Sequence, residues 1–344
     1  MNYLKVVFPF FFLIITSCQN EPIDNNAALD PTSVFQSGLV FKKVIDIPDN
    51  YFVDQMPGFT AHPKENVLYL SCRDKFISNT ETIYKINVSN QKLTIKNSAV
   101  SDFATKRNHI FEDKLYVLGG EKFNRYGLDL TEETKGSRYG SFITPKIFSR
   151  FGTCISDSDV YIIGGFLGGE TTSEPNYDRK IWKLNLIKNT FDFVDNMPKN
   201  RNGGSSEYIK GTIYTFFGYE NVKSMNSSPA IKLLNDIQVY DLSSKSFLSI
   251  PYDRQVRVSF TAKYNHYIFV AGNTTADSYE SPVNGSFMGY FDTKTNKMTE
   301  IKTIIEGNTY DFSFICEIEI MNDKVYALVR NSENSFSIQV ANLK

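Results

Sequence analysis

Arginine recurs at the start of strand-like segments along the chain, at Arg107, Arg150, Arg201 and Arg257. The planar guanidinium fork matches carboxylate and phosphate groups, so arginines gathered at one place favour an acidic ligand. The alternative is structural, because buried arginines also donate hydrogen bonds to backbone carbonyls without binding a ligand. We treat the four arginines as candidate binding residues for a small anionic or carbohydrate ligand.

Three glutamates form a candidate acid–base set. Glu317 and Glu319 alternate with Ile318 and Ile320, and both carboxylates face the same way because successive side chains of a strand point to opposite faces. Glu207 lies on the corresponding segment of another repeat. Carboxylates that face a narrow channel can have raised pKa values and act as general bases. The alternative is that the three glutamates only line a water-filled channel.

The histidine and cysteine patterns predict neither a metal site nor a cofactor. The three histidines are scattered without ligand spacing, at His62, His109 and His266. Three cysteines follow the N-terminal segment without C-x-x-C spacing, at Cys72, Cys154 and Cys316. We interpret them as buried thiols, although export from the cytoplasm would permit a disulfide.

The N-terminus has the pattern of an export signal. Lys5 precedes an apolar run over residues 6–15, which is about half the length of a membrane-spanning helix and is typical of a signal peptide. The run ends in Ile-Ile-Thr-Ser-Cys18, which resembles a bacterial lipobox. That resemblance implies that residues 1–17 are removed and that Cys18 is acylated. An ordinary secretory signal with a chance cysteine is the alternative.

The residues after Cys18 predict a flexible tether and an envelope location. Residues 18–37 are polar and sequence-poor, which suits a tether that lets an anchored domain stand off its membrane. We expect the protein to be held at the outer membrane, on its periplasmic side or at the cell surface, through the lipid on Cys18.

Composition limits the class of protein. The 344 residues are 41% hydrophobic and 14% aromatic, with a net charge of −1. Abundant aromatic residues favour strands, and the hydrophobic share is enough for a large core. The near-zero charge argues against a nucleic-acid binder, which needs a basic face. We expect a monomer whose partner is a small ligand or another protein.

One segment recurs six times and fixes the architecture. A turn is followed by a short hydrophobic strand with a tyrosine, often before paired glycines. The recurring position is Tyr69, Tyr116, Tyr161, Tyr214, Ile268 and Tyr326, at intervals of 45 to 58 residues. A period of about fifty residues matches four-stranded propeller blades and is too long for most solenoids.

Three further strands complete each repeat. A strand that usually ends in Asn or Asp follows the tyrosine strand, as in residues 181–185 and 237–241, and a third short strand follows a tight turn. Another strand precedes the tyrosine strand in a hairpin, as in residues 150–155. The sequence therefore predicts blades of four antiparallel strands, with the tyrosine strand second from the axis.

The two ends of the domain predict how the ring closes. The sixth repeat stops at residues 335–344 without a fourth strand, whereas residues 39–47 form an unassigned strand before the first repeat. If residues 39–47 supply the missing strand, no sheet edge is left unpaired there. We therefore predict an all-β, six-bladed β-propeller over residues 38–344, closed by pairing between its N-terminal strand and its last blade.

The repeats resemble Kelch repeats. The resemblance rests on the doublets Gly119-Gly120 and Gly164-Gly165, on the downstream Trp182 and on the Asp or Asn that ends the third strand. It covers roughly residues 38–344 and is weakest in the first, fifth and sixth repeats. The chain also has some similarity in size and architecture to the sialic-acid mutarotase (N-acetylneuraminate epimerase) and galactose-oxidase types of Kelch propeller.

The same pattern predicts where function resides. The connections from second to third strands and from one blade to the next emerge on one face, which we call the loop face. Three of the connections are long, at residues 166–178, 219–234 and 273–284, and long loops in a compact domain are usually functional.

Two functions remain open from the sequence. The first is a non-enzymatic module that binds a ligand or partner on the loop face. The second is a sugar mutarotase, because the mutarotase resemblance implies acid–base proton transfer near channel arginines. No dedicated acid–base residue can be matched to that family here.

Overall fold

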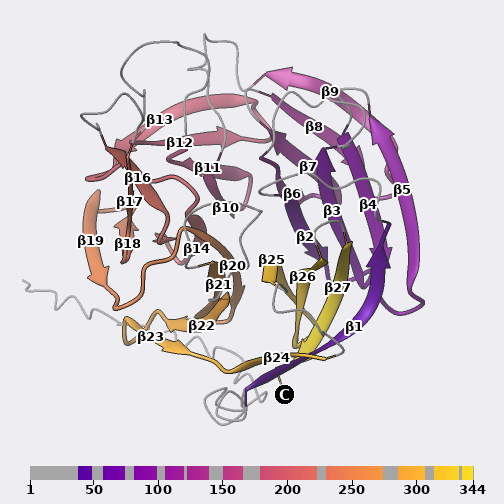
Figure 1. Cartoon of the computed structure of the whole chain (residues 1–344). Helices are drawn as coiled ribbons and strands as arrows, with labels where there is room; N and C mark the ends of the chain where they lie inside the picture. Colours follow the sequence, from indigo (N-terminus) through magenta and orange to yellow (C-terminus); the bar gives the residue numbers. More distant parts are fainter. Residues whose placement is uncertain are drawn as a thin grey trace, which may run out of the picture.

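The computed structural model describes residues 38–48, 57–73, 81–98, 105–119, 122–138, 150–165, 179–222, 230–273, 286–306, 314–332 and 335–343. Within these ranges every regular element is a β-strand, and the strands form six blades around a central axis, with an additional two-stranded hairpin (Figure 1). The prediction of an all-β, six-bladed propeller is confirmed. The proposed signal peptide, Cys18 and the tether lie outside the described residues.

Five blades each consist of four antiparallel strands, which follow one another from the axis outward. Blade 1 contains β2 (Gly58–His62), β3 (Val67–Arg73), β4 (Glu81–Asn87) and β5 (Lys92–Ser98). Blade 2 contains β6 (Arg107–Phe111), β7 (Lys114–Gly119), β8 (Lys122–Gly127) and β9 (Glu132–Arg138). Blade 3 contains β10 (Gly152–Ser156), β11 (Asp159–Ile163), β12 (Lys180–Asn185) and β13 (Thr190–Asn196).

Blade 4 carries the additional hairpin. Its four strands are β14 (Ser205–Ile209), β15 (Thr212–Phe216), β18 (Asp236–Asp241) and β19 (Ser246–Pro251). The hairpin of β16 (Tyr219–Val222) and β17 (Ala230–Leu233) lies between its second and third strands in the chain. Blade 5 contains β20 (Val258–Tyr264), β21 (Tyr267–Asn273), β22 (Ser286–Asp292) and β23 (Lys297–Glu300).

Blade 6 joins the two ends of the domain. Its inner strands are β25 (Phe314–Met321), β26 (Lys324–Ser332) and β27 (Ser335–Asn342), and its fourth strand is β1 (Leu39–Ile47). β1 pairs antiparallel with β27, from Lys42 opposite Val340 to Ile47 opposite Phe336. The predicted closure of the ring by residues 39–47 is therefore confirmed.

A second pairing at the closure was not predicted. The short strand β24 (Thr303–Ile305), which follows blade 5, pairs in parallel with the start of β1. The Leu39 N–H also donates a 2.8 Å hydrogen bond to the Lys302 carbonyl. Residues 39–41 of β1 thus pair with β24 and residues 42–47 pair with β27, so the part of β1 that extends beyond β27 also has a strand partner.

The repeated sequence features have the structural roles expected of them. The residues at the tyrosine position of the second strands are buried in all six blades. Asn87 and Asp241, which end third strands, accept hydrogen bonds from backbone N–H groups two and three residues later. These Asn and Asp residues hold the tight turns that begin the outermost strands.

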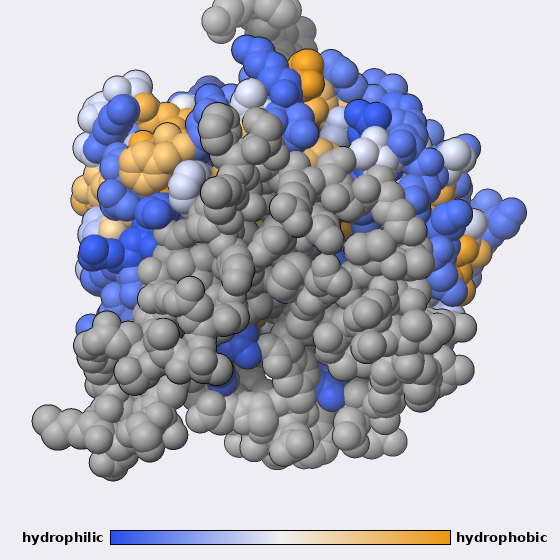
Figure 2. Space-filling view, turned by 90° about the horizontal axis from the view of Figure 1, so that it is seen from above, coloured by the Kyte–Doolittle hydropathy of each residue, from blue (hydrophilic) through white to orange (hydrophobic). Residues whose placement is uncertain are grey.

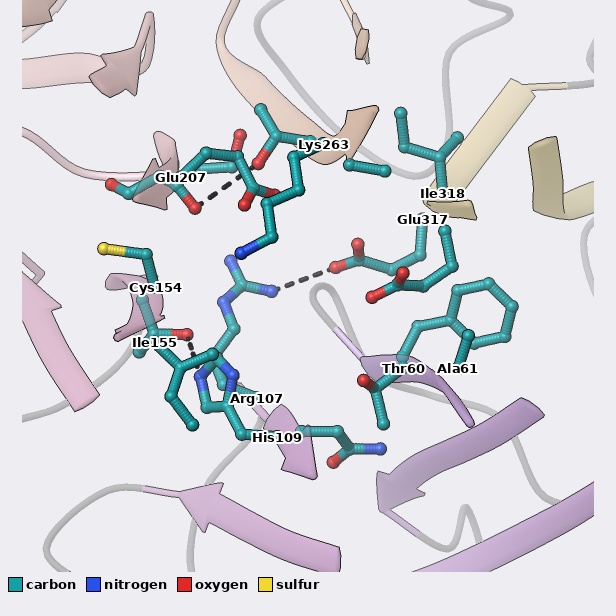
Figure 3. Close-up of a pocket in the computed structure, with 18 of the residues that line it drawn as sticks. Thr60, Ala61, Arg107, His109, Cys154, Ile155, Glu207, Lys263, Glu317 and Ile318 are labelled. Atoms are coloured by element: carbon teal, nitrogen blue, oxygen red, sulfur yellow. Dashed lines mark hydrogen bonds and ion pairs between the residues drawn. The ribbon is translucent and has the colours of Figure 1, made fainter. Parts of the chain in front are cut away.

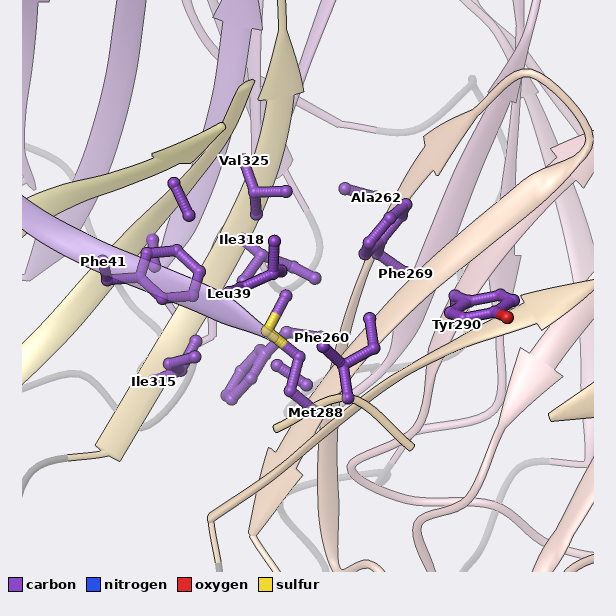
Figure 4. Close-up of a cluster of buried hydrophobic side chains, with 14 of the residues drawn as sticks. Leu39, Phe41, Phe260, Ala262, Phe269, Met288, Tyr290, Ile315, Ile318 and Val325 are labelled. Atoms are coloured by element: carbon purple, nitrogen blue, oxygen red, sulfur yellow. The ribbon is translucent and has the colours of Figure 1, made fainter. Parts of the chain in front are cut away.

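The core lies between neighbouring blades. In the largest cluster, Leu39 and Phe41 of β1 pack with Phe260 and Met288 of blade 5 and with Ile315 of blade 6 (Figure 4). The N-terminal strand therefore contributes apolar side chains to the interface of blades 5 and 6 in addition to backbone hydrogen bonds.

Where Figure 2 shows described residues, the surface is mostly hydrophilic, with smaller apolar groups among the hydrophilic ones. Exposed large hydrophobic residues include Ile95, Phe193 and Leu248, which lie on the outermost strands of different blades. Among the described residues there is also no helix long and apolar enough to cross a membrane.

The closure can be tested at Phe41 and its neighbour Val40. Phe41 is fully buried, whereas Val40 is 38% exposed. We expect Phe41→Ala to lower the free energy of unfolding by about 3–5 kcal/mol, because it leaves a cavity in the core. Val40→Ala should cost less than about 1 kcal/mol. Denaturant unfolding of both variants measures the difference, and equal small losses would show that β1 does not seal the ring.

Candidate functional site

The innermost strands of all six blades line a central cavity of about 270 Å³. Residues two apart on each inner strand face the axis, which follows from the alternation of side chains in a strand. β25 contributes Glu317 and Glu319 in this way, and β20 contributes Thr261 and Lys263. The prediction that these two glutamates point the same way, into a channel, matches this arrangement.

An ion pair joins two sides of the cavity. Arg107 of blade 2 donates a 2.9 Å hydrogen bond from Nη1 to Oε1 of Glu317 in blade 6, so the pair spans the inner strand of blade 1 (Figure 3). The Nε of Arg107 also donates a 3.1 Å hydrogen bond to the Phe151 carbonyl in blade 3. Burial raises the pKa of Glu317 to about 8 although the charge of Arg107 opposes the rise.

The pKa values of the other two glutamates in the cavity, Glu207 and Glu319, are also raised. Burial raises the pKa of Glu207 to about 7, against the opposing effects of the Lys263 charge and a hydrogen bond from Thr261. Burial also raises the pKa of Glu319 well above its ordinary value, and the negative charges of Glu207 and Glu317 add to the rise. The cavity thus holds three carboxyl groups that are ionised less readily than exposed glutamates.

His109 and Cys154 complete the titratable groups of the cavity. Burial, followed by the charges of Arg107 and Lys263, lowers the pKa of His109 to about 3, so its ring is neutral near pH 7. His109 Nε2 lies 2.9 Å from Thr153 Oγ1. Burial raises the pKa of the Cys154 thiol well above its ordinary value, which leaves it protonated and unreactive.

Two of the predicted arginines meet at a tyrosine on the loop face. Arg150 precedes β10 of blade 3 and Arg257 precedes β20 of blade 5, and their guanidinium groups lie 5.7 and 5.3 Å from the ring centre of Tyr219. Arg150 also donates a hydrogen bond to the Tyr219 hydroxyl. We call these three residues the Arg–Tyr cluster. Tyr219 is buried, whereas both arginines are half-buried.

The backbone around Gly203 holds the Arg–Tyr cluster together. The Gly203 N–H donates to the Arg150 carbonyl at 2.8 Å, and the Gly203 carbonyl accepts from the Ser259 N–H at 3.0 Å. Gly203 has a φ of +72°, and a Cβ there would lie 2.7 Å from the Arg257 carbonyl oxygen. A glycine is needed at this point because the segments before three successive blades converge on it.

Arg201 is structural rather than exposed to a ligand. It is 2% exposed, and its Nη2 donates to Asp236 Oδ1 at 2.8 Å while Nη1 donates to the Phe217 carbonyl. Burial alone would raise the pKa of Asp236, but the charge of Arg201 and a hydrogen bond from Ser249 bring it below its ordinary value. This arrangement corresponds to the structural alternative considered from the sequence.

The four arginines therefore do not form one group. Arg107 belongs to the central cavity, Arg150 and Arg257 to the Arg–Tyr cluster, and Arg201 to a buried ion pair in blade 4. Tyr219, Lys263 and Asp236 were not predicted as site residues from the sequence. Lys263 could have been found from the strand pattern. It lies two residues after Thr261 on an inner strand, just as Glu319 follows Glu317, so both residues of each pair face the axis.

The predictions about the long loops can be compared with the structure only in part, whereas those about the cysteines can be compared in full. Of the three long loops, residues 166–178 lie outside the described residues, as do nearly all of 273–284, and the described part of 219–234 forms the β16–β17 hairpin. Cys72, Cys154 and Cys316 are all buried and no disulfide joins them, in agreement with their interpretation as thiols. No group of three or more His, Cys, Asp or Glu residues suited to a metal ion occurs in the described ranges.

Comparison with known proteins identifies one repeat. Residues 147–198 match the family model described as the Kelch motif. This segment contains all four strands of blade 3, which has the Gly164-Gly165 doublet and Trp182. No protein with curated annotation matches the chain.

The different roles of the arginines can be tested by unfolding. Arg201→Ala leaves the Asp236 carboxylate buried without its main partner, so we expect the free energy of unfolding to fall by about 3–5 kcal/mol. Arg257→Ala removes a half-buried cation–π contact and should cost about 1 kcal/mol or less. Denaturant titration of both variants distinguishes them. A stable Arg201→Ala variant would contradict the structural role of Arg201.

Proposed function

Because the protein is a six-bladed β-propeller of the Kelch-repeat type, we propose that it acts as a lipid-anchored binding module of the bacterial cell envelope. In this proposal the loop face holds an anionic or carbohydrate ligand. A propeller of this kind is suited to binding, since its rigid blades present loops from several repeats on one surface.

The convergence of Arg150 and Arg257 on Tyr219 carries this proposal. The two arginines come from blades 3 and 5, and Tyr219 begins the hairpin of blade 4. Two half-buried guanidinium groups beside one aromatic ring offer planar donors for a carboxylate or phosphate group. Contact with the Tyr219 ring already restricts the side-chain conformations of both arginines, so they lose less conformational freedom when a ligand binds.

The position of the cluster agrees with a role in binding. In blades of antiparallel strands, connections between blades and connections from second to third strands share the loop face. Arg150 and Arg257 lie in connections of the first kind, and Tyr219 lies in one of the second kind. All three residues therefore belong to the loop face.

The central cavity favours a second candidate function, an isomerase similar to the sialic-acid mutarotases. Such an enzyme needs a group that exchanges protons near neutral pH. Glu207 and Glu317, with pKa values of about 7 and 8, line the cavity beside Arg107 and Lys263. This candidate differs from the first because it requires turnover of a sugar and not only its binding.

Binding can be tested with N-acetylneuraminate, an anionic sugar, followed by NMR. We expect saturable binding that weakens about tenfold or more in Arg150→Ala and in Arg257→Ala, because each removes a charged hydrogen-bond donor. Arg254→Ala is the control, since Arg254 is paired with Glu300 on the outer side of blade 5. Faster exchange between the two anomers of the sugar would favour the isomerase.

Glucuronate and inorganic phosphate serve as further anionic probes in the same experiment. If none of the three anions binds, or if the Arg150 and Arg257 variants bind them as the Arg254 control does, the loop face does not recognise anions.

The lipid anchor is tested at Cys18. We expect the protein to fractionate with membranes in cells, and Cys18→Ser to appear in the soluble fraction because it lacks the acylated thiol. Cys72→Ser is the matched control, since Cys72 is buried in blade 1. Membrane association of the Cys18 variant equal to that of the parent protein would contradict lipidation.

A further inference from the structure

The central cavity has the size and wall chemistry of a site for a small polar molecule. Its volume of about 270 Å³ falls just below the roughly 300–1,000 Å³ of pockets that hold drug-sized ligands. Its wall includes the hydroxyl groups of Thr60, Thr153, Ser206 and Thr261. These hydroxyls both donate and accept hydrogen bonds, so the wall suits a hydroxylated ligand.

The charges of the cavity do not balance. Arg107 and Glu317 compensate each other through their 2.9 Å ion pair. The remaining charged side chains of the wall are the single cation Lys263 and the two acids Glu207 and Glu319. His109 adds no charge because its pKa is about 3. When all three acids are ionised, the cavity has one negative charge in excess. Because burial raises the pKa values of these acids, this excess develops as the pH rises and is removed by protonation at lower pH.

We propose that the central cavity binds a small hydroxylated primary amine, with its ammonium group facing Glu207 and Glu319. A bound ammonium ion supplies the missing positive charge and donates three hydrogen bonds, which the two carboxylates and neighbouring hydroxyls accept. This site lies on the propeller axis, apart from the Arg–Tyr cluster, and it does not depend on an anion binding at the loop face.

The repulsion between acids explains why a cation stabilises this arrangement. Glu207 and Glu317 both add their negative charge to the effects that raise the pKa of Glu319, while Lys263 opposes them. Figure 3 shows Glu207, Lys263 and Glu317 directed from three blades toward the middle of the cavity. A cation placed there reduces the repulsion, whereas an anion would increase it.

Binding of an amine should be linked to proton release. The carboxyl groups of Glu207 and Glu317 have pKa values of about 7 and 8, so part of the cavity is protonated at pH 6. An ammonium ion favours the ionised carboxylates and displaces a proton. Affinity should therefore rise from pH 6 to pH 8.5, a range in which alkylammonium groups stay protonated. His109 stays neutral and the Cys154 thiol stays protonated over this range. Arg107, Lys263 and Glu319 are the other charged or titratable side chains that line the cavity.

Three probes of similar size but different charge show which ligand charge the cavity prefers, as measured by isothermal titration calorimetry. Ethanolamine carries a positive charge, ethylene glycol is neutral and glycolate is negative. We expect ethanolamine to bind with a stoichiometry of one, to bind more tightly at pH 8.5 than at pH 6, and to release protons, as shown by different heats in buffers of different ionisation enthalpy. Ethylene glycol and glycolate should bind at least tenfold more weakly.

Two substitutions in the cavity should act in opposite directions. Glu207→Gln keeps the shape of the side chain and removes its charge, so ethanolamine should bind about tenfold or more weakly. Lys263→Gln removes the competing positive charge and should strengthen binding. Glu306→Gln is the control, because Glu306 is an exposed partner of Lys42 at the outside of blade 6.

Several results would overturn the proposal. Tighter binding of glycolate than of ethanolamine would assign the cavity to anions. Binding of Mg²⁺ or Ca²⁺ in preference to ethanolamine would make it a metal site. Unchanged ethanolamine affinity in both Glu207→Gln and Lys263→Gln, with each variant shown to be folded by circular dichroism, would place the amine elsewhere. Absence of ethanolamine binding at pH 8.5 would remove the site altogether.

Discussion

The pairing of β1 with β27 is the constraint on which the rest of the protein depends. Each blade packs its apolar side chains against its two neighbours, so a missing strand in one blade would expose the core on both sides of it. β1 fills that place from the opposite end of the domain, and β24 pairs with its N-terminal part. The central cavity exists only because this closed ring holds six inner strands around one axis.

The ring also explains how charged groups are retained in the interior. Arg107 and Glu317 come from blades that are not neighbours, and Arg201 and Asp236 form a second buried pair in blade 4. An isolated buried charge is costly, and a pair is tolerated when further hydrogen bonds satisfy both members. Both arginines donate such bonds to backbone carbonyls, Arg107 to that of Phe151 and Arg201 to that of Phe217. Arginines near the start of successive inner strands thus have different partners.

The sequence was informative about the scaffold and much less so about the side chains that the scaffold brings together. The tyrosine repeat, the Asn and Asp turns and the unpaired terminal strands were enough to predict six blades and the closure, because these signals are local or follow from pairing every edge. The partners of the arginines were not predictable, because Asp236 and Tyr219 approach them through contacts within and between blades. Nothing in the spacing of Arg107 and Arg201 indicates that one lines the axis and the other is enclosed by a carboxylate.

The closure by β1 has a consequence for how the chain folds. β1 is synthesised before every other strand of the propeller, yet its partner β27 comes from the last residues of the domain. Contacts this distant in sequence are slow to form, because the entropy of closing the loop is lost before the contact is made. The antiparallel pairing of β1 therefore waits until the last blade has emerged, and the edge that β27 covers in the folded protein is open in the meantime.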